Sequence, residues 1–281
     1  MPRLALVTDS TADIPPDVAG EIGVRVVQAR AAFEEHAFDD NATPASVLYG
    51  RMRAEGKAPR PFGVPEPAFR AAFEAALKES PSVLCLVMPF DVSPSFTTAA
   101  AAMLSMDDVD IKILNPGVAS AGLCSFIVSI SAGVKRSWHR ERVLAAVDEI
   151  EPLCDTLFVP AEVKWLDRAG RLQLIGDRLG EIGESIPVVR VGTRMTGVAL
   201  ADTHEGALKR AVDTAGQRAA DAPLIVTVDH ADAPELAARV GEMMRGRWNV
   251  ERLIITELSA TIGSQVGPGA IGIGVAPVLR V

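Results

Sequence analysis

Three polar stretches of the sequence carry side chains suited to binding a ligand, and each directly follows a short apolar run. They are residues 8–13 (TDSTAD), 93–98 (SPSFTT) and 115–117 (NPG). Each stretch taken singly is explained by helix capping, because Asp, Ser and Thr are the preferred caps. If the apolar runs are parallel strands, the stretches meet at one edge of a sheet, where hydroxyls and helix N-termini can hold an anion without any cation. The candidate ligand contacts in these stretches are Ser10, Thr11 and Ser93.

A glycine-rich stretch near the end of the chain, residues 260–274, contains a G-x-G-x-x-G pattern at Gly267, Gly269 and Gly272. This pattern marks a dinucleotide site when it follows a strand, opens a helix and has an acidic residue about 20 positions further on. Only nine residues follow Gly272, and none of them is acidic. We therefore reject a nucleotide site and predict that the Gly-Pro-Gly at 267–269 forms a tight loop, which brings Gln265 and the backbone to the mouth of a ligand pocket.

Motifs for catalysis or metal binding are absent from the sequence. It contains no G-x-x-x-x-G-K-[ST] phosphate loop, no H-E-x-x-H zinc motif and no G-x-S-x-G nucleophile elbow. The four histidines are scattered without the spacing of metal ligands. His230 follows an apolar run, at a position where α/β sheets often hold ligands, but a structural role is the better interpretation for it. No cofactor and no metal are predicted.

The composition limits the classes of partner and the compartment. The 281 residues are 48% hydrophobic and 5% aromatic, with a formal net charge of −8 and no basic run, so nucleic acid is not an expected partner. Three widely spaced cysteines, without a C-x-x-C pair, predict buried free thiols and a cytoplasmic location. The first apolar run, residues 4–7, is too short for a signal peptide and predicts a strand.

One uncharged segment, residues 113–134, has to be weighed against a membrane span. Asn115-Pro116 interrupts it early, and small residues and serines dominate the remainder. We therefore predict a buried helix that is capped by Asn115 and has Pro116 in its first turn. No transmembrane segment is expected.

The elements that must position these residues alternate between strand and helix in the first half of the chain. The apolar runs predict strands at residues 4–8, 24–33, 83–87 and 111–114, and the patterns between them predict helices at residues 15–22, 45–55, 67–78, 97–106 and 141–153. This order implies a mostly parallel sheet with helices on both faces. The second half predicts strands at residues 156–160, 188–191, 224–228, 252–257 and 273–279, a turn at 195–198 and a helix at 234–247. We expect an α/β protein with two domains, residues 1–157 and 158–281.

Four motifs spread over nearly the whole chain are more specific together than any one of them alone. They are VTDSTADIP at 7–15, WLDRAGRL at 165–172, VDHADAPE at 228–235 and IGSQVGPGAIGIG at 262–274. In this order they resemble the motifs of the DegV family, the bacterial fatty-acid-binding proteins, which read V-T-D-S-T-A-D-L-P, Y-L-x-x-G-G-R-I, H-A-D-N-P-E and I-G-x-H-x-G-P-G-x-x-G.

The resemblance implies an α/β/α parallel-sheet domain and a two-layer α/β domain with a mixed sheet. It also implies a fatty acid between them, with the acyl chain in a buried tunnel and the carboxylate near the surface. Members of the family are carriers rather than enzymes, and they present the acid to a separate fatty acid kinase, which makes an acyl phosphate for phospholipid synthesis. Candidates for the tunnel wall, which are equally explained as ordinary core, are Leu123, Phe126, Ile127 and Ile130.

The head-group site departs from the family pattern. Relatives hold the carboxylate with a Thr-Ser pair, with a serine in an S-G-T segment and with the histidine of the last motif. Here Phe62 lies in the segment that replaces the Thr-Ser pair, Ser93 is retained, and Gln265 replaces the histidine. Arg171 matches the family's arginine near the ligand mouth. Acyl burial contributes roughly 0.8 kcal/mol per CH₂, against roughly 0.5–1.5 kcal/mol for one head-group hydrogen bond, so acyl binding can survive these changes.

Two alternatives remain open from the sequence. The first is a diverged lipid-binding or regulatory module without kinase coupling, which the changes at Pro61, Phe62 and Gln265 favour. The second is a small-substrate protein similar to the substrate-binding subunit of dihydroxyacetone kinases, which holds its substrate through a histidine. No histidine here lies in a matching motif. Acyl chain length and the nature of the head group are not set by any motif.

Overall fold

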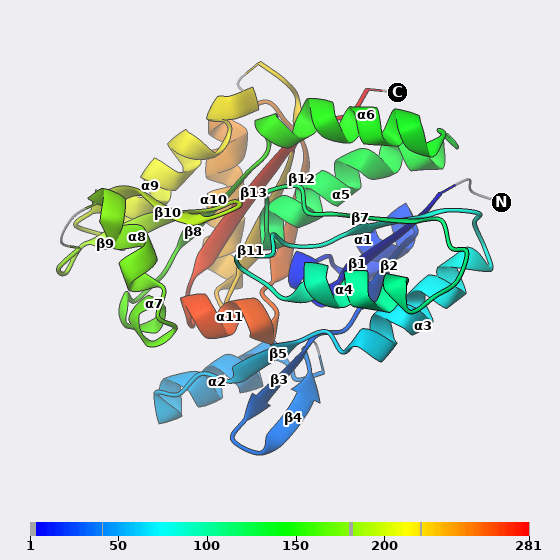
Figure 1. Ribbon diagram of the computed structural model, residues 1–281. Coiled ribbons are helices and arrows are strands. Elements are labelled where there is room, and N and C mark those ends of the chain that lie inside the picture. Colours follow the sequence, from blue (N-terminus) through cyan, green and yellow to red (C-terminus); the bar gives the residue numbers. More distant parts are fainter. Residues whose placement is uncertain (1–3, 41, 180–181, 220, 281) are drawn as a thin grey trace.

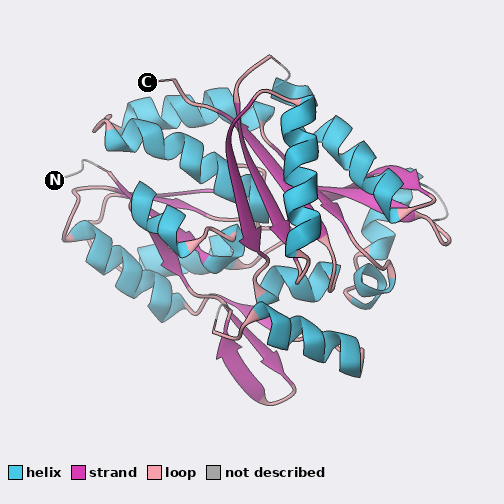
Figure 2. Ribbon diagram, turned by 180° about the vertical axis from the view of Figure 1, so that it is seen from behind, coloured by secondary structure: helices cyan, strands magenta, loops and turns pink. Residues whose placement is uncertain are grey.

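Three sheets organise the computed structural model, which describes residues 4–40, 42–179, 182–219 and 221–280 (Figure 1). A four-stranded sheet belongs to the first half of the chain and a six-stranded sheet to the second half. A small three-stranded sheet projects from one end of the molecule (Figures 1 and 2). The predicted α/β class, with one parallel and one mixed sheet, is confirmed.

The four-stranded sheet has the order β2-β1-β6-β7 and is parallel throughout. Helices α3 and α4 cover one face, where Phe69 and Phe73 are buried, whereas α1 and α5 pack on the other face. The strands and helices of this part are β1 (Ala5–Asp9), α1 (Pro16–Ile22), β2 (Val24–Val27), α3 (Glu66–Leu77), β6 (Val83–Leu86), α4 (Ser95–Leu104), β7 (Ile111–Leu114), α5 (Ser120–Lys135) and α6 (Arg140–Ile150).

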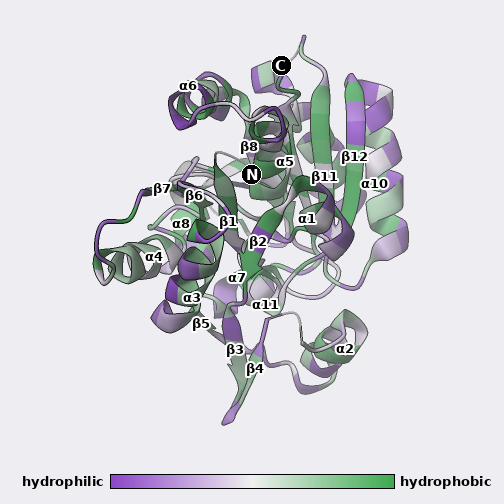
Figure 3. Ribbon diagram, turned by 90° about the vertical axis from the view of Figure 1, so that its right-hand side faces the viewer, coloured by the Kyte–Doolittle hydropathy of each residue, from purple (hydrophilic) through white to green (hydrophobic). Residues whose placement is uncertain are grey.

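The six-stranded sheet has the order β10-β9-β8-β13-β11-β12, with β11 and β12 parallel and the other neighbours antiparallel. Helices α9 and α10 pack on its outer face, and Figure 3 shows the hydrophilic residues of α10 turned outward. The elements are β8 (Asp155–Val159), α7 (Lys164–Arg168), α8 (Leu172–Leu179), β9 (Ile186–Val191), β10 (Met195–Ala201), α9 (His204–Ala215), β11 (Leu224–His230), α10 (Pro234–Arg247), β12 (Val250–Glu257), α11 (Ala260–Val266) and β13 (Ile271–Pro277).

Helix α5 lies between the two large sheets, which explains why it carries almost no charge. It contacts β11 and β13 of the six-stranded sheet and shares a core cluster with Leu6 and Leu84 of the parallel sheet. Gly274 on β13 lies directly against the backbone of α5 at Ala121. The four candidates for a tunnel wall are fully buried on this helix: Leu123, Phe126, Ile127 and Ile130. The domain boundary predicted at residue 157 falls within β8, and the whole of that strand belongs to the six-stranded sheet.

The three-stranded sheet was not predicted as a separate unit. Residues 24–33 were expected to form one extended segment, but they form β2 of the parallel sheet and then β3 (Arg30–Phe33), which pairs with β4 (His36–Asp39) and β5 (Arg60–Gly63). Pro61 lies in β5, an edge strand, where the missing backbone N–H is tolerated. Helix α2 (Ala45–Glu55) has the bounds predicted for it.

Two local predictions are wrong. Helix α5 begins at Ser120 with Ala119 at its N-cap, so Asn115 and Pro116 precede the helix instead of capping it. Residues 195–198, predicted as a turn, are the start of β10. Other predictions hold: the three cysteines are buried and free, and among the described helices none is long and apolar enough to cross a membrane.

Candidate ligand-binding site

A cavity of about 390 Å³ lies where loops from both halves of the chain meet. The loop after β6 contributes Asp91 and Val92, and the second half contributes the other lining residues, which are Arg171, Leu174, Arg194 and Met195. Its volume falls within the range of small-ligand pockets. The walls combine apolar side chains with two guanidinium groups, a pairing that suits an amphiphile with an anionic head. None of the four buried side chains of α5 proposed for a tunnel wall lines this cavity.

Helix α11 carries Gln265 into contact with Arg171, one of the residues that line this cavity. The Nε–H of Arg171 donates to Oε1 of Gln265 at 3.1 Å, and Nε2 of Gln265 donates to Oγ of Ser264 at 3.1 Å. Both ends of the glutamine amide are therefore engaged within the protein. Two residues that the sequence placed at the ligand mouth thus contact each other, although 94 positions separate them.

The Gly-Pro-Gly segment forms the predicted tight turn between α11 and β13. Gly267 and Gly269 have φ values of 81° and 82°, in the left-handed region that favours glycine. A Cβ on Gly267 would overlap the indole of Trp165, so close approach also requires glycine there. The segment follows a helix and precedes a strand, the reverse of the order in a dinucleotide-binding fingerprint, which supports rejection of a nucleotide site.

Ser93 lies next to the cavity-lining Val92 and is tied into the end of the parallel sheet. Its Oγ donates to Oγ of Ser95 at 3.0 Å and accepts from the Ser95 backbone N–H at 3.2 Å. At the same edge, the Thr8 hydroxyl of β1 donates to the Leu86 carbonyl oxygen at the end of β6 at 2.7 Å. The polar loops after β1 and β6 therefore meet at one sheet edge, as predicted, whereas Pro116 in the loop after β7 lines a different cavity.

Ser10 and Thr11 are buried beneath this edge and hold two aspartates. Thr11 donates from its backbone N–H to Oδ1 of Asp9 at 2.9 Å, and Ser10 donates to Oδ2 of Asp40 at 2.8 Å. Each of the two residues is 1% exposed, and neither lines the cavity at Arg171. Their geometry accounts for capping and loop closure, and a direct contact with ligand stays a prediction.

Phe62 is on β5 and faces a neighbouring cavity. Its ring is 49% exposed, the guanidinium of Arg60 lies 4.4 Å from the ring centroid, and the side chain lines a separate space of about 310 Å³. Gly63, the next residue, packs against Pro94 beside Ser93. The segment is therefore adjacent to the Ser93 loop, but the phenyl ring points into a different hollow.

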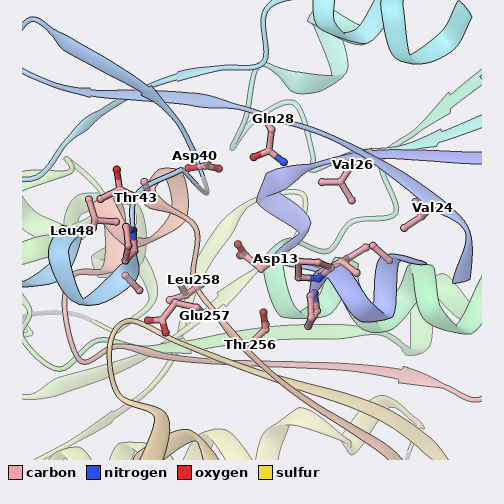
Figure 4. Close-up of a pocket in the computed structure, with 17 residues that line it drawn as sticks. Asp13, Val24, Val26, Gln28, Asp40, Thr43, Leu48, Thr256, Glu257 and Leu258 are labelled. Carbon is pink, nitrogen blue, oxygen red and sulfur yellow. The ribbon is translucent and has the colours of Figure 1, made fainter. Parts of the chain in front are cut away.

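A larger cavity, about 620 Å³, lies elsewhere and has an acidic lining (Figure 4). Asp13, Asp40 and Glu257 line it together with apolar residues of α1, β2 and α2, and no lysine or arginine is among the lining residues. Burial raises the pKa of Asp40, as desolvation of a carboxylate does. The described lining offers an anionic head group no cation, whereas the cavity at Arg171 offers two guanidinium groups and is the better candidate.

Two buried carboxyl groups share one hydroxyl between the two large sheets. Ser120 Oγ lies 2.6 Å from Oδ2 of Asp229 and also within hydrogen-bond distance of Oδ2 of Asp13. A hydroxyl has a single hydrogen, so it donates to one carboxylate and the other carboxyl must carry a proton. Burial and repulsion from Asp229 raise the pKa of Asp13 well above its ordinary value, and burial raises the pKa of Asp229 to about 6.

Sequence reasoning missed Arg194, which lies in the turn between β9 and β10. The Gly192 backbone N–H donates to the Arg194 carbonyl oxygen at 3.1 Å, and this tight hairpin carries the arginine to the cavity that Arg171 also lines. The available signal was the sequence VGTRM (191–195), in which a glycine separates two apolar runs. The wrong prediction of a turn at 195–198 displaced the hairpin by a few residues and hid this position.

Known proteins resemble this chain over its whole length. A family model described as "Uncharacterised protein, DegV family" matches residues 3–278. A DegV domain-containing protein of Halalkalibacterium halodurans is 24% identical over 277 residues, which cover 97% of this chain and 98% of the relative.

Two solved structures share the fold. A DegV family protein from Thermus thermophilus, described by its fatty acid binding, superposes with a TM-score of 0.87 at 24% identity, covering 98% of this chain and 99% of the other. DegV of Bacillus subtilis, described as a fatty acid binding protein, has a TM-score of 0.87 at 21% identity, covering 99% and 100%. With the family model matching almost every residue, the chain belongs to the DegV family.

Proposed function

We propose that this protein binds a long-chain fatty acid or a related acyl lipid, with the head group in the cavity at Arg171 and the acyl chain between the two halves of the chain. The observation that carries the proposal is the lining of that cavity, where Val92, Leu174 and Met195 lie beside two guanidinium groups. The solved relatives described as fatty acid binding support the same class of ligand. In this proposal the protein is a cytoplasmic carrier and not an enzyme.

Extraction of lipid from the purified protein, followed by mass spectrometry, tests the proposal. We expect an acyl lipid in near one-to-one ratio with protein, because burial of each CH₂ contributes roughly 0.8 kcal/mol and a long chain leaves slowly. Delipidated protein should then take up fatty acid again in a titration. Protein that yields no acyl lipid and takes up none from C10 to C18 would exclude the carrier function.

We further propose that the carrier presents its bound acid to a partner fatty acid kinase, with Arg171 at the mouth facing the kinase. Gln265 is the residue most expected to weaken this coupling, because Arg171 and Ser264 already engage both ends of its amide. A carrier that binds acid without kinase coupling is the second candidate, and the state of Gln265 favours it. Acyl-phosphate formation with an added fatty acid kinase separates the two.

Gln265→His is expected to raise acyl-phosphate formation by about 2- to 10-fold, the effect of one hydrogen bond worth roughly 0.5–1.5 kcal/mol. A neutral imidazole can accept from Arg171 through one nitrogen and donate to the ligand through the other. The exposed Gln217→His, on the far side of the six-stranded sheet, is the matched control. Equal turnover in both variants would remove Gln265 from the head-group site, and no product from any variant would favour the uncoupled module.

A further inference from the structure

Two neutral side chains beside the cavity, Gln265 and Ser93, each donate a hydrogen bond within the protein. Gln265 donates to Ser264, and the Ser93 hydroxyl donates to Ser95. Phe62, in the segment where relatives place two hydroxyls, has no donor and lines a different cavity. None of the described residues that line the cavity has a side-chain hydroxyl or amide, so a head group that enters it meets guanidinium groups in place of neutral side-chain donors.

In the described part of the chain, by contrast, the guanidinium groups of Arg171 and Arg194 keep N–H groups that are free to bind a ligand. Arg171 uses its Nε–H for Gln265, which leaves its terminal N–H groups available. Among the side chains that the structure describes, no carboxylate lies at salt-bridge distance from Arg171 or Arg194, although ion pairs engage many other arginines. Asp91 is the one acidic residue among the described residues that line the cavity. This described lining has a formal charge of +1, which matches a monoanion.

We propose that Arg194 binds the ligand head group together with Arg171 and makes this carrier selective for an anionic amphiphile, a carboxylate in place of an alcohol or ester. The inference rests on the proposed function. In place of neutral hydrogen-bond donors, two guanidinium groups hold the head group. Guanidinium groups bind carboxylates through paired, charge-assisted hydrogen bonds. Arg194 comes from the β9–β10 turn and Arg171 from the start of α8, so the two groups approach the cavity from separate elements.

Two physical consequences follow from an exposed arginine at this site. Arg194 is exposed, so its attraction for an anion is screened by salt, and affinity for a carboxylate should fall with ionic strength while affinity for an uncharged ligand should not. Asp91 opposes an anionic head group, so Asp91→Asn should tighten carboxylate binding. Both effects vanish if the head group is neutral.

Calorimetric titration of delipidated protein with decanoate and with 1-decanol tests the inference. We expect Arg194→Gln to weaken decanoate by about five-fold, the scale of an exposed ion pair, and to leave decanol unchanged. Arg194→Lys should retain most of the affinity for decanoate because it keeps the charge. Arg245→Gln, on the outward helix α10, removes the same charge away from the cavity and should change neither affinity.

The outcomes separate the inference from the function on which it rests. Wild-type protein that binds decanoate with an affinity unaffected by Arg194→Gln would overturn the role of Arg194 and leave the carrier function standing. Equal weakening of decanoate and decanol would also overturn it, because loss of packing affects both ligands alike. Wild-type protein that binds neither decanoate nor a longer acid would overturn the carrier function itself.

Discussion

Replacing Gly274 with alanine is expected to lower the free energy of unfolding by about 3 kcal/mol or more, at the upper end of what overpacking costs. Gly274 lies at the centre of β13 and faces the first turn of α5. A Cβ there would overlap the backbone of Ala121 and Gly122, and backbone atoms cannot move aside as the end of a flexible side chain can. Helix and strand would have to separate along the seam between the two large sheets.

Urea unfolding measures this effect, and the chain offers a matched control. Gly246 lies in α10, where a Cβ would meet nothing within 4 Å, so Gly246→Ala should raise stability by roughly 0.5–1 kcal/mol through helix propensity. The same chemical change is thus expected to have opposite signs at the two positions. A Gly274→Ala variant as stable as the wild type would mean that α5 and β13 are further apart than the structure has them.

Local signals explain which elements could be predicted from sequence. Helix α10 has the predicted bounds because Pro234 opens it, and α2 ends where Gly56 adopts a φ of 63°. The start of α5 could not be predicted, since Ser120 is held by aspartates 107 and 109 positions away. Strand β10 was hidden because Gly197, which resembles a turn residue, is there to admit Leu179 of α8.

Only those residues of the candidate site that belong to a sequence motif could be predicted. The resemblance brought Arg171 and Gln265 to one place, and the structure has them in contact. Arg194 belongs to none of the four motifs, and its place at the cavity depends on the pairing of β9 with β10. The acidic cavity was missed because Asp13 was taken as part of a polar loop and Asp40 lies in none of the motifs, whereas tertiary packing buries both of them.

Stability is also expected to depend on pH in a way that is unusual for an aspartate. Burial raises the pKa of Asp229 from 3.8 to about 6, so with respect to this group the folded protein is most stable below pH 4 and loses that stability as pH rises to 6. At roughly 1.4 kcal/mol for each pKa unit, the loss is about 3 kcal/mol. The raised pKa of Asp13 makes a contribution of the same sign.

Asp229→Asn should remove the pH dependence that Asp229 produces, because an amide needs no proton to stay neutral. Its oxygen can still accept from Ser120 and from the Ala121 N–H, which Asp229 engages at 2.6 and 2.9 Å. We expect the variant to exceed the wild type in unfolding free energy by about 2–3 kcal/mol at pH 7.5, and the gain to disappear by pH 4. Urea unfolding at several pH values between these limits measures the difference.

Comparison of the pH curves of the wild type and of Asp229→Asn isolates the contribution of Asp229 to stability, since the neighbouring titratable groups are the same in both proteins. Those groups are Asp13, Asp40, Tyr49, Cys124, His230 and Glu257. Asp107→Asn makes the same chemical change at an exposed site and should leave the curve parallel to that of the wild type. Parallel curves for Asp229→Asn would mean that folding does not raise the pKa of Asp229. Converging curves would establish a proton held between the sheets, and with it a contact between the two halves that weakens as pH rises, beside the space proposed for the acyl chain.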